Sequence, residues 1–286
     1  MGRGHRAAGR PASRWPNPIA VAVASVATVG LVLLLMHPAR PNPSRLRGRL
    51  SAAVQSLAQH AELSPGPMAQ ASVSGGSPAI GALFAGTGGR LGSHFCTASV
   101  VSSPHGNLLL TAAHCISHVP SGHVVFVPDY HGGRAPYGVW PVTQVIVDHA
   151  WAASADPDDD VAFLAVGGRG DGDVARLTGS EQLSFAEPYG QAVQVTGYPS
   201  NSDVPIRCTN QMRWFSPDQL QFDCTGYSFG TSGSPLLSGV SPSTGLGTLI
   251  GVIGGYEKGG DTSGVSYAAR FGPSVDALYR TALARS

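Results

Sequence analysis

Short apolar runs separated by glycine, proline and other turn residues are the feature that most limits how this chain can fold. Such runs are long enough for a β-strand and too short for an ordinary helix. They occupy residues 94–101, 107–111, 123–128, 139–147, 161–166, 191–196 and 248–254. Because 38 glycines and 22 prolines punctuate the sequence, the pattern predicts an all-β fold. A helix is expected near the C-terminus, with Ser274 as its N-cap. Its apolar face would consist of Val275, Leu278, Ala282 and Leu283.

Charge divides the chain into two parts. Eight arginines and no acidic residue precede Glu62. From Ala79 to the C-terminus, ten Lys and Arg stand against sixteen Asp and Glu, which gives this part a net charge of −6. Proteins that bind nucleic acid present a basic surface. The globular part does not carry that excess of basic residues, so we expect no nucleic-acid partner.

The N-terminal segment has the pattern of a membrane anchor. Residues 1–18 are polar and basic, and residues 19–36 form an uninterrupted apolar run. That length reaches the lower limit for spanning a bilayer and exceeds the usual signal-peptide core of roughly 7–15 residues. The positive-inside rule keeps the arginines in the cytoplasm and places the rest of the chain outside. The pattern favours a transmembrane signal-anchor helix. A cleaved signal peptide is the alternative, with Ala39 as a poor cleavage signal.

Residues 37–78 are rich in Pro, Ser, Gly and Ala, a composition typical of a linker. We interpret them as a stalk that holds the globular domain off the membrane, with a removable pro-segment as the alternative. The globular domain is expected to span residues 79–286. It contains all four cysteines, which allow three disulfide pairings. Disulfides indicate export from the cytosol.

Three short motifs carry residues that nucleophilic catalysis needs. Ser232 lies in Gly-Thr-Ser-Gly-Ser-Pro, residues 230–235, and a serine nucleophile requires a base to take its proton and a carboxylate to orient that base. The candidate base is His114, in Thr-Ala-Ala-His-Cys. The candidate carboxylate is Asp160, which directly precedes the apolar run Val-Ala-Phe-Leu. The neighbouring Asp156, Asp158 and Asp159 are interpreted as a solvated loop, with a hard-cation site as the alternative.

These motifs, in the order His, Asp, Ser, resemble the three signature segments of the chymotrypsin-fold (trypsin-like) serine proteases. The resemblance implies two packed six-stranded antiparallel β-barrels with a C-terminal helix. It also implies a serine endopeptidase that hydrolyses peptide bonds through an acyl-enzyme and needs neither cofactor nor metal. In that family the N–H groups corresponding to Gly230 and Ser232 form the oxyanion hole.

The resemblance also implies which cysteines pair. In the family, the cysteine after the catalytic histidine pairs with one on the preceding strand, which selects Cys96 and Cys115. Cys208 and Cys224 remain as the second pair, and this pair is similar to that of the bacterial glutamyl endopeptidase branch. Like that branch, the chain lacks the aspartate that precedes the serine in digestive proteases and binds their new N-terminus; Thr231 stands there. We therefore expect activity without a free N-terminus at Ile80.

By the same resemblance, the walls of the substrate pocket come from three segments: residues 226–229, residues 254–256 and the region around residues 264–266. No aspartate stands at the pocket base, which argues against Arg or Lys substrates, and Ile253 replaces the histidine of the glutamyl branch, which argues against glutamate. A small or apolar side chain remains by elimination. The backbone of residues 254–256 would pair with an extended substrate as an added strand. The expected substrate-binding residues are Gly226, Tyr227, Phe229, Gly254, Gly255 and Tyr256.

Two other functions remain open at this point. Fold does not guarantee activity, so a catalytically silent binding or regulatory module is one alternative, and an esterase-type acyl hydrolase is the other. The leading hypothesis is a monomeric endopeptidase that acts on peptide or protein substrates outside the cytoplasm. The Lys-poor composition, rich in Gly, Ala, Pro and Arg, is typical of a GC-rich bacterium. The protein would be anchored to the bacterial cell membrane by its N-terminal segment, or secreted.

Overall fold

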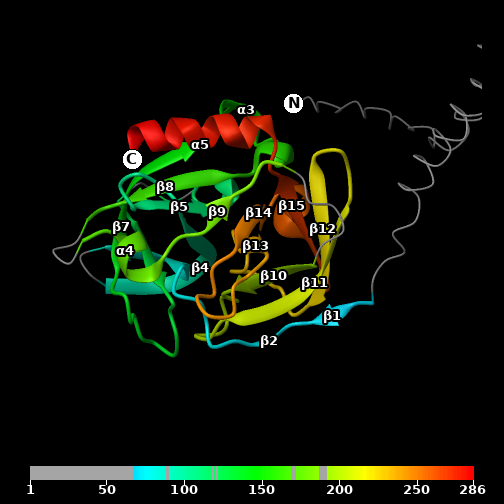
Figure 1. Ribbon diagram of the computed structural model, residues 1–286, viewed down its shortest axis with the longest axis horizontal. Helices are drawn as coiled ribbons and strands as arrows, with labels where there is room; N and C mark the ends of the chain where they lie inside the picture. The colour runs from blue at the N-terminus through cyan, green and yellow to red at the C-terminus, as the bar shows by residue number, and fades with distance from the viewer. Residues whose placement is uncertain (1–66, 88–89, 118, 120–121, 169–171, 187–191) are drawn as a thin grey trace, which may run out of the picture. The chain divides into compact units, whose positions relative to one another are not determined.

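The computed structural model describes residues 67–286, except 88–89, 118, 120–121, 169–171 and 187–191 (Figure 1). The basic segment, the expected anchor at 19–36 and most of the expected linker lie outside the described residues. Within the described part of the chain, no helix is long and apolar enough to cross a membrane.

The first barrel closes from six antiparallel strands in the order β3-β4-β5-β8-β7-β6. Its strands are β3 (Ile80–Thr87), β4 (Arg90–Val101), β5 (Leu108–Thr111), β6 (Val124–Pro128), β7 (Trp140–Val147) and β8 (Ala162–Val166). In β5, Leu109 packs inside the barrel, whereas Leu108 and Leu110 pack in a second cluster outside it. Both faces of β5 are therefore buried, which explains why its sequence is apolar without alternation.

The second barrel also has six antiparallel strands, joined in the ring β10-β11-β12-β15-β14-β13. Its strands are β10 (Ala192–Gly197), β11 (Ile206–Trp214), β12 (Gln219–Thr225), β13 (Pro235–Ser238), β14 (Thr248–Ile253) and β15 (Val265–Arg270). Three two-residue strands extend this sheet: β1 (Ala69–Gln70) beside β12, β2 (Ser72–Val73) beside β11 and β9 (Gln182–Leu183) beside β14. The expectation of two six-stranded barrels is confirmed. The sheet of the second barrel includes β1 and β2, which lie before Ala79, the expected start of the domain.

A shared apolar cluster joins the two barrels. It contains Phe163 from the first barrel, Leu249 and Val252 from the second, and Val275 and Leu278 from the C-terminal helix. Figure 1 shows this helix, α5 (Pro273–Arg285), lying beside β8. The C-terminal helix is thus confirmed.

The N-cap of α5 differs from the one expected. It is Gly272, with no side-chain cap bond, and Pro273 takes the first helical position. Proline suits this position because its fixed φ matches the helix and its missing N–H would have no helical partner there. Ser274 therefore lies inside the first turn instead of capping it. The helix also buries Ala282, one of the residues of the expected apolar face.

Each barrel contains one disulfide. Cys96 of β4 is bonded to Cys115, in the turn after β5, and Cys208 of β11 is bonded to Cys224 of β12. These are the two pairings that the family resemblance implies.

Glu181 is a buried carboxyl in the connection between the barrels. Its backbone pairs with β4, since its N–H donates to the carbonyl of Val100 at 2.9 Å and its carbonyl accepts from Ser102 at 3.0 Å. Oε2 accepts from the N–H of Gly247 at 2.6 Å, and Oε1 has no hydrogen-bond partner among the described residues. Burial raises the pKa of Glu181 to about 7, although the bond from Gly247 acts in the opposite direction.

We expect Glu181 to make the protein less stable as the pH rises from 4.5 to about 7. The folded protein keeps this proton to about pH 7, whereas the unfolded chain releases it near 4.5. Between these values the unfolded state binds fewer protons, so the free energy of unfolding falls with pH, by about 3 kcal/mol in total. Glu181→Gln keeps an acceptor for Gly247 and should remove this decrease. Urea unfolding at about pH 5 and about pH 8 measures it; the same decrease in both proteins would contradict the assignment.

Candidate active site

His114 lies in a short turn directly after a buried strand. β5 ends at Thr111, and the chain then forms the 3-10 helix η2 (Ala113–Cys115). Ala113 and Cys115 are buried in the core of the first barrel, and the disulfide to Cys96 ties the turn to β4. The residues on either side of His114 therefore fix its backbone, while its imidazole stays partly exposed, at 14%.

Asp160 follows the 3-10 helix η3 (Pro157–Asp159) and directly precedes Val161 and β8. Its side chain is 0% exposed, and a buried carboxylate requires donors around it. The backbone N–H of His114 donates to Oδ1 at 2.8 Å, and the N–H of Gly255 donates to Oδ2 at 2.7 Å. The ring nitrogen Nδ1 of His114 also lies 2.7 Å from Oδ2. Because a carboxylate only accepts, Nδ1 carries the proton and the Nε2 lone pair of the neutral ring is free.

The three carboxylates before Asp160 are not simply a solvated loop. Asp156, Asp158 and Asp159 are each partly buried. Asp156 accepts from the backbone N–H of Asp158 at 3.1 Å, and Asp158 accepts from the side chain of Gln219 at 2.8 Å. Burial raises the pKa of Asp159, and nearby carboxylates raise it further. One oxygen each of Asp156 and Asp158 thus already accepts a hydrogen bond from the protein.

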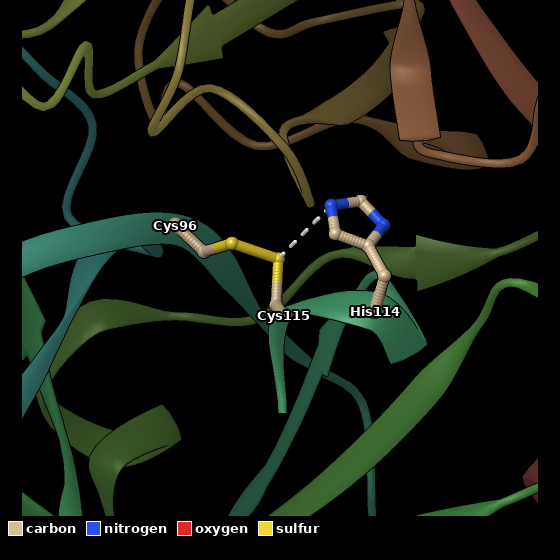
Figure 2. A group of neighbouring side chains, drawn as sticks. All are labelled: Cys96, His114 and Cys115. Atoms are coloured by element: carbon tan, nitrogen blue, oxygen red, sulfur yellow. Dashed lines mark hydrogen bonds between the residues drawn. A yellow bond between two sulfur atoms is a disulfide. The ribbon is translucent and has the colours of Figure 1, made fainter. Parts of the chain in front are cut away.

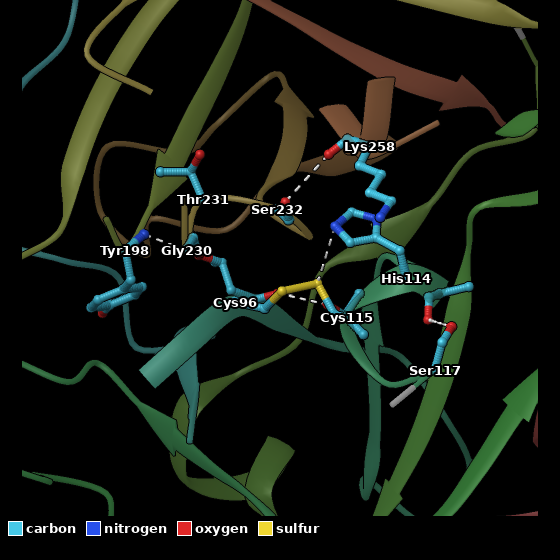
Figure 3. The surroundings of a disulfide bond; sticks show 12 residues. Cys96, His114, Cys115, Ser117, Tyr198, Gly230, Thr231, Ser232 and Lys258 are labelled. Atoms are coloured by element: carbon cyan, nitrogen blue, oxygen red, sulfur yellow. Dashed lines mark hydrogen bonds between the residues drawn. A yellow bond between two sulfur atoms is a disulfide. The ribbon is translucent and has the colours of Figure 1, made fainter. Parts of the chain in front are cut away.

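Ser232 lies in the loop between β12 and β13 and lines a cleft of about 590 Å³ that His114 also lines. Figure 3 shows both side chains beside the Cys96–Cys115 disulfide. The Ser232 hydroxyl donates to the backbone carbonyl of Lys258 at 3.5 Å. Among the described residues, no hydrogen bond joins Ser232 to His114. The structure therefore brings the two candidates to one cleft, with the hydroxyl bonded to Lys258.

The backbone before Ser232 turns the N–H of Gly230, a residue on the cleft lining, away from Ser200. The carbonyl of Phe229 accepts from the N–H of Ser200 at 2.7 Å. In a trans peptide the carbonyl and the following N–H point in opposite directions, so the N–H of Gly230 points away from Ser200. Gly230 has φ +97°, and a Cβ there would lie 2.5 Å from the nitrogen of Ser200 and from the carbonyl oxygen of Tyr198. Glycine is therefore required at this position.

Thr97 of β4, which no sequence motif singled out, joins the first barrel to the Ser232 loop. Its N–H donates to the carbonyl of Ser232 at 2.8 Å, and its hydroxyl donates to the carbonyl of Gly230 at 3.0 Å. The hydroxyl also accepts from the N–H of Tyr198 at 3.0 Å. The only sequence signal for Thr97 is its position after Cys96, because its bonds form only where the barrels meet.

Cys96, His114 and Cys115 bring potential metal-ligating atoms within 4.8 Å of one another (Figure 2). The two sulfurs, however, are bonded to each other, whereas a cysteine binds metal as a thiolate. Nε2 of His114 lies 3.8 Å from Sγ of Cys115. In this group the disulfide packs against the imidazole and offers no thiolate ligand.

Comparison with known proteins identifies the family. The model of the trypsin-like peptidase domain matches residues 96–246, which is more than half of the chain. This chain belongs to the trypsin-like peptidase family. The match includes His114, Asp160 and Ser232 within one peptidase domain. A comparison with curated proteins finds no match.

Solved structures agree with this membership. The protease Anisep from Arthrobacter nicotinovorans is similar at 26% identity and a TM-score of 0.63, with 75% of this chain and 99% of that chain covered. The thermostable serine protease AL20, from an extremophilic microorganism, is similar at 25% identity and a TM-score of 0.62, with 73% and 99% covered. A Glu endopeptidase, solved in complex with MPD, shares the fold at 16% identity and a TM-score of 0.58, with 76% and 98% covered.

A local bond holds Thr231 in this trypsin-like peptidase. Thr231 is buried, and its hydroxyl donates to the carbonyl of Ser228 at 2.7 Å. Ile80, the residue that the N-terminus hypothesis concerns, is buried in β3, and its N–H donates to the carbonyl of Ser77 at 3.0 Å. The turn before Ser232 is thus held by a neutral hydrogen bond.

The cleft of the peptidase is lined differently from the expected pocket. Of the six expected residues, Tyr227 and Phe229 are on the lining, and the 90% exposed Phe229 projects into solvent. Gly226, Gly254, Gly255 and Tyr256 are not on the lining. The N–H groups of Gly255 and Tyr256 are bonded to Asp160 and Gln219 instead. The lining continues through residues 257–263, which the sequence did not indicate, and includes Ser266 from the third expected wall segment.

The segment that reaches Ser232 has an unusual backbone. The 3-10 helix η4 (Tyr256–Gly259) contains Glu257 at φ 51° and Lys258 at φ 54°. The left-handed region costs a non-glycine residue about 1–2 kcal/mol. Gly255 and Gly259, at φ 76° and 104°, flank the three-residue segment Tyr256–Lys258. The Lys258 carbonyl is therefore brought to Ser232 by a turn that has an intrinsic conformational cost.

Proposed function

We propose that this trypsin-like peptidase is a serine endopeptidase that cleaves peptide bonds through an acyl-enzyme, with Ser232 as nucleophile, His114 as base and Asp160 as the orienting carboxylate. The observation that carries the proposal is the bonding of Asp160. Its buried carboxylate accepts from both the backbone and the ring of His114, which leaves Nε2 as an acceptor in the cleft that Ser232 lines. This orientation of the ring supports a role for His114 as general base toward Ser232.

The steps follow from these positions. The Ser232 hydroxyl leaves the Lys258 carbonyl and transfers its proton to Nε2 of His114 as Oγ attacks the substrate carbonyl carbon. The N–H groups of Gly230 and Ser232 stabilise the resulting oxyanion; loss of one such donor costs about 2.7–4 kcal/mol of transition-state stabilisation. His114 then protonates the leaving amine as the C–N bond breaks. Water then attacks the acyl-enzyme. His114 takes a proton from this water and returns it to Oγ of Ser232 as the ester bond breaks.

The proposed setting is outside the cytoplasm. The two disulfides are compatible with an oxidising compartment. We propose the domain organisation expected from the sequence for the rest of the chain: a basic segment at 1–18, an anchor or signal peptide at 19–36 and a linker or pro-segment at 37–78.

Labelling with a fluorophosphonate tests the proposal. This probe reacts only with a serine that has an assembled base and oxyanion hole, and intact mass shows each adduct. We expect one adduct on the parent protein and none on Ser232→Ala or His114→Ala, with turnover of Ser232→Ala lowered about a millionfold. Ser234→Ala, which changes the buried serine two residues on, is the matched control and should keep the adduct.

The same experiment separates the alternatives. A parent protein that is folded and oxidised but not labelled would support a catalytically silent binding module. A labelled protein that turns over ester but no peptide in a library would support an acyl hydrolase of the esterase type.

A further inference from the structure

Gln219 is a buried amide whose polar atoms are all bonded to protein. It is the first residue of β12 and is 3% exposed. Nε2 donates to the carbonyl of Pro157 at 2.9 Å and to Oδ1 of Asp158 at 2.8 Å. Oε1 accepts from the backbone N–H of Tyr256 at 3.1 Å. Because each unpaired buried polar atom would cost free energy, these bonds fix the side chain in one orientation.

The two segments that Gln219 holds are also the segments that hold Asp160. The first is η3, which ends directly before Asp160. The second is the peptide of Tyr256, which follows Gly255, the donor to Asp160 Oδ2 at 2.7 Å. Asp160, η3, Gln219 and this peptide thus form a closed ring of covalent and hydrogen bonds around the carboxylate. The ring is tightly packed, since a Cβ on Gly255 would lie 2.2 Å from Oε1 of Gln219.

We propose that Gln219 is a positioning residue for hydrolysis: its amide holds the Asp160 carboxylate in the orientation that keeps Nε2 of His114 free toward the cleft. The inference rests on the proposed function of the His114, Asp160 and Ser232 side chains. Gln219 is not on the cleft lining and acts through Asp160. Gln219 does not touch Asp160 itself and acts through the two segments beside it. Outer partners that orient metal ligands are worth about 10- to 100-fold in activity, and we expect an effect of that order here.

Gln219→Met tests the role directly, because it keeps the length of the side chain and removes its donors and acceptor. We expect kcat and the rate of fluorophosphonate labelling to fall about 10- to 100-fold, with KM changed less than about threefold. Gln221→Met is the matched control. Gln221 lies on the same strand, and its amide donates to Asp223 at 2.6 Å, so this variant should keep the parent kinetics.

A double variant distinguishes positioning from a general structural role. If Gln219 acts through Asp160, Gln219→Met should lower the residual activity of Asp160→Asn by less than about threefold. Losses that multiply in the double variant would overturn the proposal, because they would show that Gln219 acts on substrate binding or on the whole domain. Parent activity in Gln219→Met would overturn it as well.

A spectroscopic measurement makes the test independent of turnover. The low-field proton resonance of the bond between His114 Nδ1 and Asp160 should be present in the parent and in Gln221→Met, and lost or shifted in Gln219→Met. If Gln219→Met does not fold, Gln219→Glu replaces it, because this variant keeps an acceptor for Tyr256. The same measurements on Gln219→Glu should give the same result. A parent that is not labelled would refute the proposed function, and an unchanged resonance in the variant would refute the positioning role.

Discussion

Asp160→Asn is expected to lower kcat/KM about ten-thousandfold, which is about 5 kcal/mol of transition-state stabilisation. Asp160 accepts three bonds on its two oxygens, from the N–H groups of His114 and Gly255 and from Nδ1 of His114. An asparagine has one acceptor oxygen and one NH₂ group. With the oxygen kept toward the His114 backbone, the NH₂ faces Nδ1, and the ring then carries its proton on Nε2. That tautomer cannot take the proton of Ser232.

Steady-state kinetics on a cleaved peptide measures this effect, with thermal unfolding as the check that the variant folds. Asp158→Asn is the matched control, because it changes a carboxylate two residues away and keeps an oxygen for the bond from Gln219. It should stay within about threefold of the parent. Comparable activity of Asp160→Asn and Asp158→Asn would exclude Asp160 as the orienting carboxylate.

Gly233→Ala is expected to destabilise the protein by about 3 kcal/mol or more. Gly233 has φ +82°, and a Cβ there would lie 2.1 Å from the carbonyl oxygen of Thr97 and 2.2 Å from the hydroxyl of Thr111. Both neighbours belong to the first barrel and are bonded to each other at 2.8 Å. Neither can move away from the added Cβ without straining this hydrogen bond. The melting temperature should fall by about 6–12 °C, and labelling of Ser232 should slow because its loop must shift.

Gly239→Ala provides the matched control for this prediction. Gly239 has φ +61° in the next turn of the chain, and a Cβ there would meet no atom within 4 Å. Its cost is that of the left-handed backbone alone, about 1–2 kcal/mol. Equal melting temperatures of the two variants, measured by calorimetry, would show that the contact between Gly233 and the first barrel is not tight.

The sequence predicted what depends on local pattern. β5 and β8 were recognised because both faces of each strand are apolar. His114 and Asp160 were singled out as candidates because they lie in short motifs next to these strands. Of the twelve barrel strands, β3, β11, β12, β13 and β15 were not recognised. Polar residues interrupt β11 and β12, where Thr209, Asn210 and Gln211 follow one another and Gln219 begins the next strand. Their strand structure comes from pairing in a closed barrel, which a single segment does not encode.

The candidate site also contains contacts that local sequence patterns do not predict. Nothing near Gln219 in the sequence indicates that its amide holds η3 and Tyr256, because those partners are 62 and 37 residues away. The contact between Ser232 and Lys258 was equally hidden. It uses a backbone carbonyl, which every residue has, so no side-chain motif predicts it.

The bonds of Thr97 have a consequence for when this site can exist. A ribosome releases the whole first barrel, with His114 and Asp160, before Ser232 has been translated. The loop of Ser232 is then fixed through Thr97, from the opposite barrel. An unfinished or truncated chain therefore has the candidate base without the nucleophile. Under the proposed function, hydrolysis therefore requires that both barrels have been synthesised and have docked.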